Sequence, residues 1–227
     1  MPMQVGFSRW FPQRCAICAV DVAAPLVCAA CLEDFFSVRR NRCLCCAIPL
    51  PGSASTCPAC LRQPPHYDVT IALADYAAPV DGLVLALKFG HQLELAPILG
   101  SLLAERARHL APCPLLLAVP LAFERLAERG FNQSAEIGRA VARALRAKFD
   151  LSILMRVRHA AAQASLSLAA RRRNIRDAFL VRGDVRGQSV AVIDDVMTSG
   201  STLDEIARVL KIAGATHVTN LVVARTP

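Results

Sequence analysis

Eight cysteines near the start of the chain fall into four pairs, each with two residues between its members: Cys15/Cys18, Cys28/Cys31, Cys43/Cys46 and Cys57/Cys60. A C-x-x-C turn presents two thiolates on one tight loop, so it supplies half of a tetrahedral zinc site and a second turn completes the site. The spacing therefore predicts two structural zinc ions. Because the thiols must lose their protons to bind metal, we expect this segment to unfold when zinc is removed.

The pairing of the four turns is open at this point. Sequential pairing joins the first turn to the second and the third to the fourth, but an interleaved arrangement is also compatible with one sequence. Iron–sulfur clusters commonly use other cysteine spacings, and a thioredoxin-type redox pair usually occurs once, inside a βαβ unit, so both interpretations are weaker. Cys45, beside a paired cysteine, and the distant Cys113 are predicted not to bind metal.

A second chemical feature is the stretch VAVIDDVMTSGST at 190–202, where four apolar residues run into the adjacent carboxylates Asp194 and Asp195. Like charges in contact cost energy, so stability alone does not explain the pair. Carboxylates are good acceptors for the vicinal hydroxyls of a ribose. The loop that follows combines hydroxyls, a flexible glycine and the start of a helix, which suits a phosphate. A ribose 5-phosphate would use both halves, with the phosphate at Thr198, Ser199, Gly200, Ser201 and Thr202.

The elements that must position these groups alternate between strands and helices. Strands are predicted at 69–76, 115–120, 153–157, 178–183, 189–195 and 217–224, and helices at 81–90, 95–112, 131–149 and 202–214. Thr202 and Glu205 are predicted to form a capping box for the last helix. The alternation favours an α/β domain with a mainly parallel sheet, whose ligands bind at the carboxyl ends of strands. Pro64 and Pro65 mark a boundary, and we predict domains at 1–66 and 67–227.

The composition places the chain among globular proteins, since 54% of its 227 residues are hydrophobic and 19% are charged. No apolar run approaches the roughly 18 residues of a membrane span, and the N-terminus lacks a signal-peptide pattern, so we predict a cytoplasmic protein without a membrane span. The formal net charge of +8 permits an anionic partner such as a nucleotide or nucleic acid. A compositional bias of the source is an alternative explanation for the many arginines.

The stretch D-D-x-x-T-S-G-S-T after an apolar strand resembles the phosphoribosyl pyrophosphate (PRPP) loop of type I phosphoribosyltransferases. The segments VPLAFERLAERGFNQ (119–133), ALKFG (86–90) and QASLSLAARRRNIRDAF (163–179) resemble the signature segments of the ComF family. That family couples an N-terminal double zinc ribbon to a phosphoribosyltransferase-like domain. The resemblance therefore implies a type I phosphoribosyltransferase-like sheet preceded by a small zinc-ribbon domain.

The same resemblance implies roles for particular residues. Asp194 and Asp195 would hold the ribose hydroxyls of PRPP, and residues 198–202 its 5-phosphate. Mg²⁺ would be bound mostly through PRPP oxygens. The groups near the pyrophosphate or over the site would be Val119, Pro120, Leu121, Arg129 and Lys88, and the arginines Arg171, Arg172 and Arg173 are candidates for contact with nucleic acid.

Several residues of these segments have a second interpretation or limit the assignment. Thr198 resembles the orotate-type loop, because purine-salvage relatives carry an aspartate here, and it therefore removes a candidate general base. No catalytic residue is assigned. Asn132, within the RGFNQ segment, could cap a helix as well as stand near the site. Lys88 and the arginine cluster are also explained by simple exposure to solvent.

Two functions from different classes fit the sequence. The favoured one, implied by the ComF resemblance, is a PRPP-binding protein of natural transformation that handles single-stranded DNA with a helicase-like partner. The second is an active phosphoribosyltransferase that moves ribose 5-phosphate from PRPP to an unknown base or amine. The intact D-D loop argues against a purely structural adaptor. Because few polar residues between 69 and 110 suit the edges of a base, we expect PRPP binding with weak or no activity on common bases.

Overall fold

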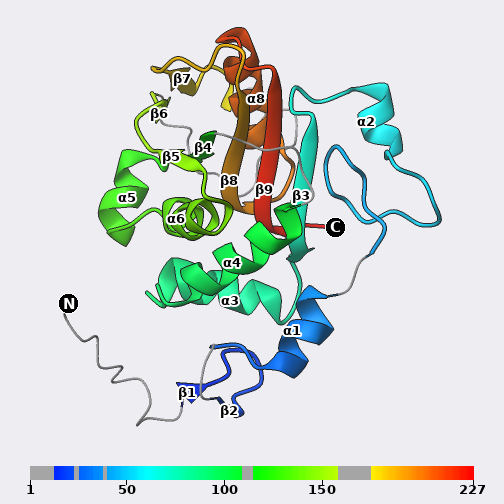
Figure 1. The fold of residues 1–227 in the computed structure, drawn as a ribbon, viewed down its shortest axis with the longest axis vertical. Coiled ribbons are helices and arrows are strands. Elements are labelled where there is room, and N and C mark those ends of the chain that lie inside the picture. Colours follow the sequence, from blue (N-terminus) through cyan, green and yellow to red (C-terminus); the bar gives the residue numbers. More distant parts are fainter. Residues whose placement is uncertain (1–12, 23–25, 38–39, 109–114, 158–174) are drawn as a thin grey trace.

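The computed structural model describes residues 13–22, 26–37, 40–108, 115–157 and 175–227. At its centre lies a five-stranded parallel sheet with the strand order β3-β9-β8-β4-β5 (Figure 1). The prediction of an α/β fold with a mainly parallel sheet is therefore confirmed. The strands are β3 (Val69–Asp75), β9 (His217–Arg225), β8 (Ser189–Met197), β4 (Leu115–Ala118) and β5 (Lys148–Asp150).

Helices cover both faces of this sheet, which is why its central strands are almost continuously apolar. Alternate residues of β8 point to the two sides: Ala191 and Ile193 join one core, and Val190 and Val192 join the other. Each core also contains residues of helices that come after the eight paired cysteines in the sequence. These are α3 (Val80–Phe89), α4 (Leu95–Ala107) and α6 (Gln133–Leu145) on the first side, and α8 (Ser201–Ile212) on the second.

The cysteine-rich segment is divided between the two faces of the sheet. Its first half contains α1 (Ala29–Phe36), whose Cys31 and Phe36 share a core with α3 and α4, and its second half shares a core with Tyr67, Met197 and α8. Figure 1 shows the first half at the bottom of the molecule and the second half at the right. The remaining elements of the segment are β1 (Gln13–Arg14), β2 (Asp21–Val22) and α2 (Pro58–Arg62). The domain division at residue 66 stays a prediction.

Short elements complete the described fold: α5 (Phe123–Arg129) and the antiparallel strands β6 (Leu154–Arg156) and β7 (Phe179–Val181). The helix predicted at 131–149 ends at Leu145, because Arg146 adopts a left-handed conformation with φ 53° and the next residues join the sheet edge as β5. In the described ranges, no helix is both long and apolar enough to cross a membrane.

Candidate functional site

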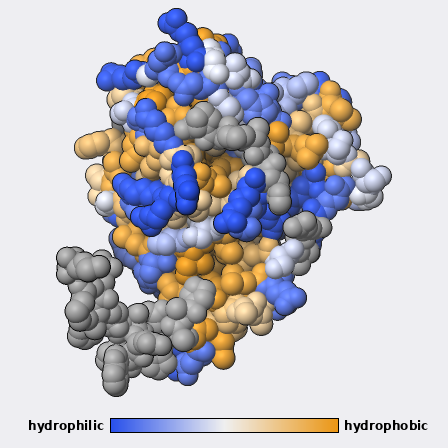
Figure 2. Space-filling view, in the orientation of Figure 1, coloured by the Kyte–Doolittle hydropathy of each residue, from blue (hydrophilic) through white to orange (hydrophobic). Residues whose placement is uncertain are grey.

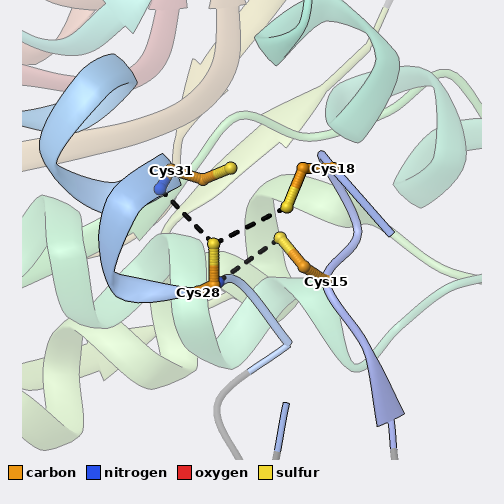
Figure 3. Close-up of side chains that lie close together, drawn as sticks. All are labelled: Cys15, Cys18, Cys28 and Cys31. Atoms are coloured by element: carbon orange, nitrogen blue, oxygen red, sulfur yellow. Dashed lines mark hydrogen bonds between the residues drawn. The ribbon is translucent and has the colours of Figure 1, made fainter. Parts of the chain in front are cut away.

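The eight paired cysteines form two clusters, one from the first and second turns and one from the third and fourth. Within each cluster the four sulfur atoms lie within 4.8 Å of one another, and Figure 3 shows the first set pointing toward a common centre. The Sγ atoms of Cys18 and Cys28 are 3.7 Å apart, as are those of Cys46 and Cys57. A zinc ion with four sulfurs at about 2.3 Å requires sulfur separations of about 3.8 Å. The clusters therefore fit tetrahedral zinc, in the sequential pairing.

Each cluster is supported by backbone N–H groups that donate to sulfur. Cys28 caps α1 and accepts from the N–H of Cys31 at 3.5 Å, and Cys57 caps α2 and accepts from the N–H of Cys60 at 3.4 Å. Such bonds stabilise the thiolate form that metal binding requires. Cys45 belongs to neither cluster, as predicted, and Cys113 lies outside the described residues.

The carboxylate pair lies near the carboxyl end of β8, which continues to Met197 rather than ending at the aspartates. Asp194 Oδ1 accepts from the Ser134 hydroxyl at 3.0 Å and from the N–H of Asp195 at 2.9 Å. Lys88 Nζ, at the end of α3, forms an ion pair with Asp195 Oδ2 at 2.8 Å. This buried oxygen has no hydrogen-bond donor with good geometry in the described part of the chain, so it keeps acceptor capacity.

The pKa of Asp194 lies well above the ordinary value of an aspartate. Burial, together with the charge of Asp195, raises the pKa of Asp194 from 3.8 to about 7, although hydrogen bonds from Ser134 and the Asp195 N–H act in the opposite direction. Burial also lowers the pKa of the Arg129 guanidinium, against the opposing effect of Asp195. A carboxyl group that titrates near neutral pH is typical of functional sites.

Asn132 connects the turn after β4 to the start of α6. Its Oδ1 accepts from the N–H of Ser134 at 3.0 Å and caps the helix, as predicted, while its Nδ2 donates to the Val119 carbonyl at 3.0 Å. Close by, Arg129 donates to the Gln133 side chain and lies 5.2 Å from the centre of the Phe89 ring. One side chain therefore fixes the turn and the helix start, and the neighbouring arginine contacts the end of α3.

The loop after β8 leads into α8, but it does not contain the predicted capping box. Gly200 is the N-cap, with φ 78°, and no side chain caps the helix. Thr202 is already in the first turn, and Glu205 instead accepts from the N–H of Asp177 at 2.8 Å and pairs with Arg208. The hydroxyls of Ser199 and Ser201 are 3.0 Å apart. The prediction failed because the N-cap is Gly200, two residues before Thr202, and because Glu205 accepts from the distant N–H of Asp177.

The structure thus links several of the predicted site residues. Lys88 contacts Asp195, Val119 is joined to α6 through Asn132, and the loop at 198–202 directly follows β8. Pro120 and Leu121 follow Val119 and are partly buried. Arg171, Arg172 and Arg173 lie outside the described residues.

Sequence reasoning missed two residues at this edge of the sheet. Ser134 contacts Asp194 across 60 positions of sequence, and no local pattern distinguishes it from a second capping residue. Arg225 donates to the carbonyls of Met197 and Thr198. The sequence does contain a signal for Arg225, because an arginine that directly follows the apolar run of a buried strand needs buried hydrogen-bond partners.

Comparison with known proteins gives two family-model matches. Residues 132–227 match the phosphoribosyl transferase domain, and residues 8–61 match the double zinc ribbon domain. The fold is therefore a type I phosphoribosyltransferase-like sheet preceded by a small zinc-ribbon domain, as the resemblance implied.

Full-length relatives and a solved structure give further similarities. DNA utilization protein YhgH of Escherichia coli (strain K12) is 34% identical over 225 residues, which cover 95% of this chain and 98% of that protein. Competence protein F of Haemophilus influenzae is 30% identical over 221 residues, which cover 92% and 96%. Among solved structures, the glutamine PRPP amidotransferase from B. subtilis is 25% identical with a TM-score of 0.40, covering 56% of this chain and 25% of that one.

Proposed function

The chain belongs to the ComF family, and on that premise we propose that it binds PRPP with Mg²⁺ at the carboxyl ends of β4 and β8 and serves DNA uptake in the cytoplasm. The observation that carries the proposal is the carboxylate pair, held by Ser134 and Lys88 immediately before the loop at 198–202. The two relatives described above are named for DNA utilization and for competence. The described cysteines form no disulfides, which is typical of a compartment that keeps thiols reduced.

In the proposed complex, Asp194 and Asp195 accept from the ribose hydroxyls, and Asp195 Oδ2 is a buried acceptor that already faces the Lys88 ammonium. The N–H groups and hydroxyls of residues 198–202 hold the 5-phosphate at the start of α8. Val119, Pro120 and Leu121 form the turn that meets the pyrophosphate, with Arg129 and Lys88 as its charges. Mg²⁺ would neutralise pyrophosphate charge, and the nearby carboxylates suit such a hard cation.

Two exposed aromatic rings near the site support the single-stranded DNA part of the proposal. Phe89 is 67% exposed, follows Lys88 and lies under Arg129, while Phe123, at the other end of α5, is 75% exposed. Figure 2 shows hydrophobic residues gathered over the region of α3 and α4, next to groups of hydrophilic residues. Aromatic rings beside arginines bind single strands by stacking and charge, and the chain carries a net charge of +8. Arg171, Arg172 and Arg173, which lie outside the described residues, are proposed to contact the same single strand, and a helicase-like protein is the proposed partner in uptake.

A phosphoribosyltransferase activity is the second candidate. The observation that favours it is the pKa of Asp194, which lies near neutral pH at the proposed ribose site, where a group that accepts and releases protons would be useful. A screen of common bases and amines for pyrophosphate release from PRPP separates the two candidates. Release with one acceptor would establish a transferase, and none would leave a binding protein.

Calorimetry with PRPP and Mg²⁺ tests the binding site. We expect Asp194→Asn/Asp195→Asn to weaken PRPP binding by a factor of about 100 or more, because each lost charged hydrogen bond is worth about 1.5–3 kcal/mol. The control is Glu33→Gln/Asp34→Asn, which removes an equal charge from an exposed pair on α1. Equal affinity for the site variant and the wild type would refute the proposed pocket.

Fluorescence titration with single-stranded DNA over a salt series tests the second part. Affinity should fall steeply as salt rises, and Phe89→Ala/Phe123→Ala should weaken binding by about 10-fold or more, since each stacked base is worth about 1–3 kcal/mol. Ile212→Ala, which removes an exposed apolar side chain on α8, is the control. No binding even at low salt would exclude direct contact with DNA.

A further inference from the structure

Arg225, the last residue of β9, is a buried arginine whose hydrogen bonds all go to backbone carbonyls. Arg225 is only 8% exposed. Nε donates to the Cys46 carbonyl at 2.8 Å, while Nη1 donates to the Met197 carbonyl at 3.1 Å and to those of Thr198 and Thr226. One side chain therefore joins a cysteine of the second cluster to the first residues of the loop after β8.

The buried charge of Arg225 needs compensation. A guanidinium taken out of water costs several kcal/mol unless its partners restore the lost interactions. In the described part of the chain its hydrogen bonds reach no carboxylate. Four thiolates around one Zn²⁺ leave a net charge of about −2, and Cys46 belongs to such a cluster. A zinc-loaded second cluster would supply the compensating charge, and Cys46 also provides the carbonyl that Nε contacts.

The bonds to Met197 and Thr198 also orient the loop. In a planar trans peptide the C=O and the N–H of the next residue point in opposite directions. Because Arg225 holds the carbonyls of Met197 and Thr198, the N–H groups of Thr198 and Ser199 point away from it. They therefore face away from the second cluster, which is the orientation that would present them to a phosphate.

The loop has room to move if this contact is lost. A cavity of about 230 Å³ lies between the second cluster and the loop, and its lining includes Cys57, Tyr67, Gly200 and Arg225. Gly200 is already close to Tyr67, since an added Cβ would lie 3.3 Å from the tyrosine oxygen. Arg225 thus lines the cavity between the second cluster and the loop and contacts both.

We propose that Arg225 is a positioning residue that couples the second cysteine cluster to the loop at 198–202, so that metal in this cluster alone sets the loop for phosphate. The first cluster lies on the other face of the sheet and has no such connection among the described residues. The inference deepens the proposed PRPP site and rests on it for the identity of the phosphate. The coupling of metal to loop order does not depend on that identity.

Hydrogen exchange of the loop amides tests the coupling without any ligand. Arg225→Met and Cys57→Ser should both speed exchange of residues 198–202 by about tenfold or more, because the loop carbonyls lose their anchor. The matched controls are Arg42→Met and Cys28→Ser. Arg42 also joins the second cluster to the sheet, through the Ala47 carbonyl and Asp75, but it does not contact the loop. Equal protection in Arg225→Met and Arg42→Met would overturn the proposal.

Release of zinc to a chromogenic chelator provides a second readout in the wild type. Binding equilibria are reciprocal, so PRPP should strengthen zinc binding at the second cluster, in competition with the chelator, by the same factor by which metal strengthens PRPP binding, which we expect to be about tenfold. Release from this cluster should slow as a result. Cys28→Ser, with the second cluster intact, should keep this effect, and Arg225→Met should lose it. If PRPP binds but slows neither zinc, the coupling is wrong. If PRPP does not bind, the proposed site fails, and the exchange experiment still decides the coupling.

Discussion

The two zinc ribbons are built alike but are placed differently in the molecule. In each, the third cysteine caps a short helix and accepts from the N–H of the fourth. In the first ribbon Cys18 is exposed and Cys28 is partly exposed, whereas all four cysteines of the second ribbon are buried. The first ribbon reaches the sheet through α1 and the carbonyl of Phe36, to which Arg106 donates. The second shares its core with Met197 and α8.

The C-x-x-C motif and the position of the ribbon in the fold determine different properties. The C-x-x-C turns determine the sulfur geometry, which is the same in both ribbons, with one sulfur pair at 3.7 Å in each. Placement determines what depends on the metal. Loss of metal from the first ribbon would disturb the contacts of α1 with α3 and α4, while loss from the second would disturb the core that it shares with Met197 and α8, next to the loop at 198–202.

Cys57→Ser and Cys28→Ser give the largest expected difference between the ribbons. Serine keeps the helix cap in both cases but removes one zinc ligand. We expect each variant to retain one zinc per chain, and Cys57→Ser to lose more than about 4 kcal/mol of unfolding free energy, against about 2 kcal/mol or less for Cys28→Ser. Metal analysis and chemical denaturation measure both quantities. Equal losses would show that position in the fold does not matter.

The parts of the site that the sequence predicted are those that local chemistry determines. The cysteine turns, the cap at Asn132 and the order of strand, carboxylates and loop all arise from residues within a few positions of one another. The contacts that sequence reasoning missed are distant: Ser134 with Asp194 across 60 positions, and Arg225 with Cys46 across 179. No periodicity identifies such partners, because they are brought together only when the sheet forms.

The failed predictions follow the same rule. Thr202 and Glu205 have the local pattern of a capping box. The Glu205 carboxylate instead accepts from the N–H of Asp177 and forms an ion pair with Arg208. The helix α5 was missed because none of its residues is buried, so it carries little apolar periodicity. Tertiary contacts overrode a local signal in the first case, and in the second there was little signal to find.

A pH series distinguishes the metal-dependent parts from the carboxylate pair. The pKa of Asp194 is raised from 3.8 to about 7, so its contribution to stability is fully present below about pH 4 and is lost as pH rises through 7. The unfolding free energy of Asp194→Asn, relative to that of the wild type, should therefore rise by about 2 kcal/mol between pH 5 and pH 8, because one pKa unit corresponds to about 1.4 kcal/mol. Denaturation midpoints at several pH values measure the difference.

The ribbons should respond to pH with the opposite sign. Zinc binding weakens as thiolates are protonated, so the difference in unfolding free energy between the wild type and Cys57→Ser should grow as pH rises.

Ser134→Ala removes a hydrogen bond that favours the charged form of Asp194, and it should move the Asp194 transition to higher pH. A constant difference between Asp194→Asn and the wild type across this range would contradict the raised pKa.

The smallest expected effect compares one ion pair from each ribbon. Arg14 and Asp21 lie 3.8 Å apart in the first ribbon, with side chains 78% and 70% exposed, whereas Arg42 and Asp75 lie 2.7 Å apart and are each 16% exposed. Arg14→Met should change the unfolding free energy by less than about 0.5 kcal/mol, because exposed pairs gain little over their interactions with water. Arg42→Met should cost about 1–2 kcal/mol, since it also leaves the Ala47 carbonyl without its donor.

The two ion pairs should also differ in how their contributions to stability respond to salt. At about 1 M salt the screening length is about 3 Å, so any effect of Arg14→Met should vanish, while most of the Arg42→Met effect should remain because its partners are shielded from solvent. Denaturation of both variants at low and high salt measures this. A loss for Arg42→Met that disappears in salt would mean that the second ribbon is held to the sheet no more firmly than the first, and the contrast between the two ribbons would then rest on their cores alone.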